Sequence, residues 1–498
     1  MSIDGQRDLW FMSNSNPNAA RSQSPPVPKR RISSENWEGL RMQFDDAHLT
    51  GAAGMPLMFL HERNLKMKQH LARSIKLGRR SDAFGPSECS KFLIDSKLQG
   101  LNRISHVKEI RKDPVYCKEY GLSELPCGKT IGKYLKNFQQ NHLESLRRLN
   151  NRFTDRLIRH GCRRAEEAAR QVADGEKTPP QDIRLMERDQ KGHLQVGLDY
   201  DSSCMAVYGK QEGSDRGRHP RKKDSPGFQP KFAFLSGLDV MVHQRLYPES
   251  RGLNSGFKDF YQESKELIRS PMTLKYLRGD CALYSKENVR MFEADGLTFG
   301  ITAQKTSHMW EAIDRLEESD WIEFESEDGD TVELAELYYK PATWPGSPRV
   351  FVLSRRLSES RYARLFDGQK YDVFAYLTNY KGTLWERYKF CVGRCTVEKC
   401  IRESKLGFDW HHLPCAEEAA NRAYLGHVQL AYNLMISFKL TALGGEAKRW
   451  SADRIRRSIL MLPGRFSPRN GNILHLPDWW PHQHHIQHAH RQLIDFNR

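Results

Sequence analysis

The stretch L-Q-V-G-L-D-Y-D-S-S, residues 194–203, decides the fold. Its apolar side chains alternate onto one face, as they do in a β-strand: Leu194, Val196, Leu198 and Tyr200. Asp199 and Asp201 share the other face, so this strand carries two carboxylates into a sheet.

More strands are predicted further along the chain, at 205–208, 232–238, 240–246, 273–277 and 299–303. A helix over 256–269 precedes the strand that leads to Asp280. Strands that run into a helix and then back into a strand indicate a mixed α/β sheet, which we expect over residues 191–305 and again over 371–465.

Residues 306–370 differ from what surrounds them. The pieces W-I-E-F-E (321–325), T-V-E-L-A-E-L-Y-Y (331–339) and R-V-F-V-L-S (349–354) are strand patterns joined by acidic or Gly/Pro-rich turns. They predict a β-rich insertion, after which V-F-A-Y-L-T-N (373–379) returns to the main sheet.

Residues 51–190 are predicted to be helical, with strongly basic stretches at 61–80 and 143–160. Ser123 as a cap, followed by a helix over 130–138, suits a helix-turn-helix DNA-binding element; a helical bundle that makes no groove contact fits equally well. The C-G-K-T at 127–130 is not a phosphate-binding loop, because Ser123 stands where that loop needs its first glycine.

The two ends of the chain read as unpacked segments. Residues 1–50 are rich in Ser, Asn, Pro and Arg, which predicts a disordered basic arm. Residues 466–498 form a His/Trp-rich tail, either a metal-binding tract or a partly ordered tail whose histidines are idle. Before this tail, residues 420–440 form a long helical pattern.

Charge points to a polyanionic partner. Lys and Arg number 78 and Asp and Glu 62, a formal net charge of +16. Double-stranded DNA is the leading candidate and an anionic membrane surface the second. No apolar run reaches the ~18 residues of a spanning helix, and the N-terminus lacks the pattern of a signal peptide. We therefore expect a soluble, cytoplasmic protein that is not bound to membranes and whose ten cysteines are reduced thiols.

The stretch C-V-G-R-C-T-V-E-K-C-I-R-E-S-K, residues 391–405, is predicted to be one helix. Arg394, Glu398 and Lys405 then fall within roughly 40° of one another around the axis. Glu398 can hold a divalent metal while Arg394 and Lys405 bind phosphates beside it. The alternative is a solvated helix with i,i+4 charge pairs. A zinc site at Cys391, Cys395 and Cys415 is a further alternative, although helical periodicity disfavours a tetrahedral site here.

Three acids from separate elements suit two-metal phosphodiester chemistry: Asp201 (or Asp199) on a strand, Asp280 after a strand, and Glu398 on a helix. Mg²⁺ suits such a site because it takes few protein oxygens and keeps its waters, and Mn²⁺ can substitute.

The chain resembles bacterial DDE insertion-sequence transposases, namely the insertion sequence 1380 group related to piggyBac-type transposases. The resemblance runs from about residue 50 to 476 and is carried by residues 113–131, 198–213, 276–285 and 397–407. It implies an RNase H-like mixed-sheet catalytic core interrupted by a β-rich insertion and preceded by a helical DNA-binding region.

The same resemblance assigns roles to residues. The family's first Asp precedes a Ser or Thr by two positions, which favours Asp201 over Asp199, and the second maps to Asp280. The family's Tyr-x2-Arg-x3-Glu-x6-Lys signature falls on Arg394, Glu398 and Lys405, with Cys391 in place of the Tyr.

The resemblance also implies the function. It indicates a Mg²⁺-dependent enzyme that cleaves strands at the ends of a mobile element, with a hairpinned end in related enzymes, and joins them to target DNA. It implies a homodimer on paired ends, on the bacterial nucleoid. The alternative is a sequence-specific DNA-binding protein derived from such an enzyme and without catalysis.

Overall fold

A computed structural model describes residues 41–78, 84–173, 188–207, 209–217, 225–248, 255–270, 272–325, 331–357, 371–467 and 473–495. The chain divides into two compact units, Met1–Ala47 and His48–Arg498, and everything below concerns the second. Most of the basic arm predicted for residues 1–50 lies outside the described residues; Leu49–Thr50 form strand β1.

The strand predicted over residues 194–203 is the middle strand of the core. β2, Leu194–Ser202, pairs antiparallel with β6 (Lys231–Leu235), which pairs antiparallel with β7 (Val240–Arg245). On its other side β2 is parallel to β8 (Met272–Gly279), which is parallel to β9 (Thr298–Thr302). This order and these directions are those of an RNase H-like core, so the predicted fold class is confirmed.

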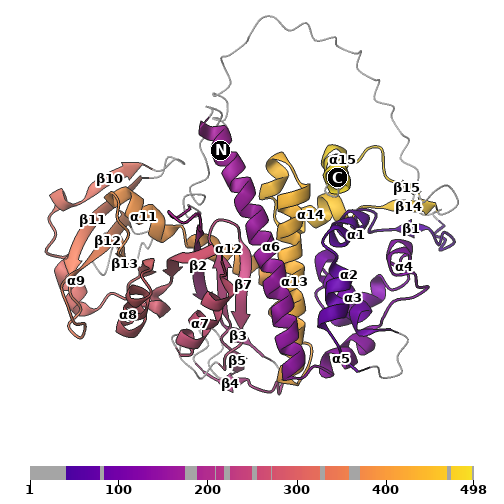
Figure 1. The fold of residues 1–498 in the computed structure, drawn as a ribbon, viewed down its shortest axis with the longest axis horizontal. Coiled ribbons are helices and arrows are strands. Elements are labelled where there is room, and N and C mark those ends of the chain that lie inside the picture. The colour runs from indigo at the N-terminus through magenta and orange to yellow at the C-terminus, as the bar shows by residue number, and fades with distance from the viewer. Residues whose placement is uncertain are drawn as a thin grey trace, which may run out of the picture. The chain divides into compact units, whose positions relative to one another are not determined.

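The predicted insertion strands extend this same sheet. β13 (Tyr371–Thr378) pairs with β9, and outward from it follow β12 (Arg349–Leu357), β11 (Thr331–Tyr339) and β10 (Ile322–Glu325). The described residues thus form a nine-stranded sheet (Figure 1). Two small sheets accompany it: β3 (Met205–Ala206), β4 (Asp215–Arg216) and β5 (Pro226–Phe228), and β1 with β14 (Gly464–Ser467) and β15 (Ile473–His475).

Helices cover both faces of the core, which explains why β2 is buried on both sides rather than on alternate residues. The ring of Tyr200 meets α7 (Phe257–Leu267), with ring centroids 5.4 Å from Phe257. The opposite face, which carries Asp199 and Asp201, lies under α11 (Leu384–Val392) and α12 (Cys395–Gly407). α8 (Lys286–Ala294) and α9 (Ser307–Ile313) link β8, β9 and β10.

α13, Glu418–Ala442, is buried almost all round because it packs between other elements. It lies along α6 (Gln140–Ala173) and contacts β7 (Figure 1). It also contacts helices of the N-terminal region: α1 (Met55–Asn64), α3 (Pro86–Gln99) and α5 (Gly128–Lys136), which α2 (Met67–Ser74) and α4 (Pro114–Tyr120) accompany.

The stretch read as a C-terminal tail is structured where it is described. After the short helix α14 (Ala452–Ile455), the chain forms α15, Gln483–Asp495, which packs on α13 and α1. Ile486, Ala489 and Leu493 are buried there, at the i, i+3, i+7 spacing of an amphipathic helix. No helix of the described residues is long and apolar enough to cross a membrane.

Candidate active site

Asp201 and Asp280, the two acids predicted at strands, lie next to each other at the ends of neighbouring strands. Asp201 is the penultimate residue of β2, and its Oδ1 accepts from the backbone N–H of Ser202 at 2.7 Å. Asp280 directly follows β8 and caps a short 3₁₀ turn through its Oδ1, which accepts from Ala282 N–H at 3.1 Å. Because β2 and β8 are parallel neighbours, both carboxylates lie where the C-terminal ends of these two strands meet. This side of the sheet is here called the acidic edge.

The predicted helix 391–405 is in fact two helices, and this prediction was wrong. α11 ends at Val392 and α12 begins at Cys395, with Gly393 and Arg394 in a turn between them. Glycine has a low helix propensity, so Gly393 is the residue of this stretch that least favours a continuous helix. The break separates Cys391 from the charged side chains of α12.

The break places Arg394 at the start of α12, above the sheet edge. Its guanidinium lies 3.5 Å from Asp201 Oδ2 and 3.3 Å from Glu398 Oε1. The Arg394 side chain is 14% exposed and that of Glu398 60% exposed. The structure therefore gathers Asp201, Asp280 and Glu398 around one cationic side chain, although the three carboxylates are not all within 4.8 Å of one another.

Lys405 lies further along α12, and its side chain also reaches the end of β2 that carries Asp201. Its ammonium donates to Ser203 Oγ, two residues after Asp201. Burial lowers the pKa of Lys405, and the nearby Cys204 and Asp201 oppose that shift. Asp201, Ser203, Glu398 and Lys405 share the wall of a groove of about 830 Å³.

Electrostatics distinguish the acids. Burial raises the pKa of Asp201 to about 7, and the neighbouring Asp280 and Glu398 add to the shift while Arg394 opposes it. Burial also raises the pKa of Asp280, against the charges of Arg394 and Lys231. Packing like charges at a partly buried edge leaves a deficit of positive charge there.

Two residues of this site were not found from the sequence. Lys231 on β6 is buried, and burial lowers its pKa to about 8 even though Asp280 favours its charged form. Arg278 on β8 binds Asp199 in a bidentate pair, with Nε to Oδ1 at 2.6 Å and Nη2 to Oδ2 at 2.8 Å. Arg278 precedes Asp280 by two residues, as Asp199 precedes Asp201, and this shared spacing is the pattern that could have identified the pair.

Cys391 does not reach the groove. It is buried on α11 beside Phe390, and a Cβ on Gly300 would lie 3.0 Å from its sulfur. Burial raises its pKa to about 12. Cys395 is exposed and Cys415 is buried with its N–H on Asn421, so the described residues bring no three of these thiols together and the zinc alternative is wrong.

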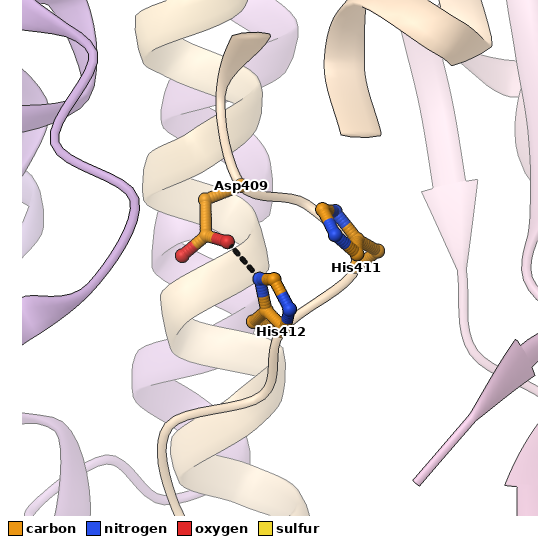
Figure 2. A group of neighbouring side chains, drawn as sticks. All are labelled: Asp409, His411 and His412. Carbon is orange, nitrogen blue, oxygen red and sulfur yellow. Dashed lines mark hydrogen bonds and ion pairs between the residues drawn. The ribbon is translucent and has the colours of Figure 1, made fainter. Parts of the chain in front are cut away.

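A different group of side chains lies close enough together to hold a metal ion: Asp409, His411 and His412, of which the two histidines line the groove and Asp409 is buried (Figure 2). The carboxylate of Asp409 already has hydrogen-bond and ion-pair partners, however. It accepts from Lys97 at 3.2 Å and from the Tyr424 hydroxyl at 3.0 Å, and it pairs with His412 Nδ1. These contacts make Asp409 a link between α3, α13 and the loop after α12.

The strand order and the acidic edge define a protein of the RNase H-like class. The family described as transposase DDE domain group 1 matches residues 181–497, which is more than half of the chain. The chain belongs to this family, and it is a DNA transposase.

Among solved structures the chain is similar to one in the cryo-EM structure of a piggyBac transposase synaptic complex with hairpin DNA, with a TM-score of 0.38 and 11% identity. The match covers 82% of this chain and 79% of that chain, and at this TM-score it adds nothing to the family assignment. No curated protein matches the chain.

Proposed function

We propose that this transposase cleaves DNA strands at the ends of a mobile element and joins them to target DNA, using Asp201, Asp280 and Glu398 as metal ligands. The observation that carries the proposal is the position of Arg394 between Asp201 and Glu398, at an edge where burial and like charges raise the pKa of Asp201 to about 7. Such an edge favours binding of additional positive charge.

The donor set fits a hard divalent cation, because it consists of carboxylate oxygens from three separate elements. Mg²⁺ is the proposed cofactor, with Mn²⁺ as a substitute; when bound, such ions activate the attacking oxygen and stabilise the leaving oxygen.

The chain's own residues position the DNA. Arg394 forms ion pairs with Asp201 and Glu398, and its guanidinium can bind a phosphate beside them. Lys405 is held by Ser203 at the groove wall, where its ammonium can contact the next phosphate as a point charge. We further propose that two copies hold two element ends, in the bacterial cytoplasm.

The test uses DNA taken from the flanks of the reading frame. Glu398→Gln or Asp280→Asn should abolish Mg²⁺-dependent strand cleavage, because each removes a ligand charge, while binding in a mobility-shift assay stays close to that of the unaltered protein. Glu311→Gln, an exposed acid on α9, is the matched control and should cleave normally.

Two outcomes would contradict the proposal. Normal cleavage by Glu398→Gln would show that the acids are wrongly assigned. Unaltered protein that binds the DNA but never nicks it with Mg²⁺ or Mn²⁺ would favour the catalytically inactive DNA-binding protein. The mass of the protein–DNA complex would report whether two copies are present.

A further inference from the structure

A fully buried ion pair lies directly behind the acidic edge. Asp199 on β2 and Arg278 on β8 are register partners, and each side chain is 2% exposed. Removing two charges from water costs several kcal/mol per ion, so a buried pair is weak evidence for stability as such. The geometry of its third contact indicates another role.

That third contact reaches across to the helix break. Arg278 Nη1 donates to the backbone carbonyl of Phe390 at 3.3 Å, in the last turn of α11. The last carbonyls of a helix lack partners within the helix, and a cation is favourable at that end. A Cβ on Gly393 would lie 2.0 Å from the same nitrogen, so only glycine leaves room for the guanidinium against the turn.

Arg394 directly follows Gly393 in the chain, and its guanidinium lies between Asp201 and Glu398. Glu398 itself is 60% exposed, so packing does little to fix it; its position depends on where α12 begins. Asp199 and Arg278 each lie two strand residues, about 7 Å, before a site acid. One rigid pair of strands therefore carries both the acids and the contact that places the helix.

We infer that Asp199, Arg278 and the Phe390 carbonyl, here called the Arg278 clamp, position the break between α11 and α12 and so hold Arg394 and Glu398 over Asp201 and Asp280. Arg278 is thus a positioning residue that acts through the turn at Gly393. This inference rests on the proposed function only where it concerns metal binding.

The main test is Arg278→Lys in the full chain. Lysine keeps the charge opposite Asp199, so no buried carboxylate is stranded, but it loses the forked donors that bind Asp199 and Phe390 together. Amide hydrogen exchange should rise in peptides covering 384–398 and stay unchanged in those covering 194–202 and 272–279. Mn²⁺ affinity, followed by electron paramagnetic resonance without DNA, should fall about tenfold, which corresponds to about 1.4 kcal/mol.

A pair of glycine substitutions provides the matched control. Gly393→Ala pushes a methyl group against Arg278 without changing any charge and should give the same local exchange and the same loss of Mn²⁺ affinity. Gly407→Ala, at the other end of α12, meets only ordinary contacts, the nearest at 3.5 Å, and should change neither.

The inference is overturned if Arg278→Lys exchanges and binds Mn²⁺ like the unaltered protein, or if exchange rises equally across the sheet, which is the result for a general stabilising pair. Absence of DNA cleavage by the unaltered protein would instead count against the proposed function, and the exchange comparison would still decide on the clamp.

Discussion

At the scale of one residue, Asp201 makes stability depend on pH. Its pKa is raised to about 7 by burial, Asp280 and Glu398, whereas a carboxyl group in an unfolded chain has a pKa near 3.9. Between about pH 4 and pH 7 the folded protein holds a proton that the unfolded chain has released. The free energy of unfolding therefore contains a contribution that is lost as pH rises through this window.

Asp201→Asn removes this titration. The difference in the free energy of unfolding between the variant and the unaltered protein should depend on pH. In the absence of divalent ions, we expect it to shift in favour of the variant by about 2–3 kcal/mol between ~pH 5 and ~pH 8. Denaturant unfolding in a chelator at both pH values measures it. Asp259→Asn, an exposed acid on α7, should show no such change, and an equal difference at both pH values for Asp201→Asn would refute the expectation.

At the scale of an element, α13 protects the edge of the sheet. β7 is an edge strand with a register shift opposite Ala233 and Phe234, which leaves backbone groups to be satisfied. Asn433 on α13 accepts from Met241 N–H at 3.0 Å and donates to Met241 C=O at 2.9 Å. Gln429 donates to the carbonyls of Met241 and Val242.

Asn433→Leu should therefore lower the free energy of unfolding by about 1–3 kcal/mol, because it leaves the buried N–H of Met241 without its hydrogen-bond partner. Denaturant unfolding measures the loss. The control is Thr441→Val on the same helix. The Thr441 hydroxyl donates to the Ser437 carbonyl one turn away, and its loss should cost less than ~1 kcal/mol. Equal losses in the two variants would contradict this account of the edge.

The elements also show what the sequence could and could not predict. Alternation in 194–203 located the middle strand and its acids, because a strand's period is local. The helix break at Gly393 was missed, since the contact that positions it comes from Arg278, more than 100 residues earlier in the chain. The family resemblance aligned Cys391 with the Tyr of the signature, on the same predicted helix as Glu398, whereas Cys391 is buried on the preceding helix.

At the scale of the whole molecule, the net charge of +16 predicts DNA binding that is strongly sensitive to salt. A protein that neutralises about six phosphates loses about 10³-fold in affinity between ~50 and ~200 mM salt. Fluorescence anisotropy with a labelled duplex should show a loss of at least this size. Lys405→Gln should lower the slope of log affinity against log salt by about one, and a slope near zero would refute the prediction.

The long helix α13 receives contacts from the start of the chain as well as from the sheet: His61 meets Ser437 at 3.0 Å, and Tyr134 meets His427 at 3.1 Å. The N-terminal helices pack on one another, but they therefore cannot complete their packing until α13 has been synthesised. Within the sheet, β9 likewise pairs with β13, which follows about 70 residues later in the chain. A chain truncated before residue 418 would lack α13, and both the N-terminal helices and β7 would lose the element against which they pack.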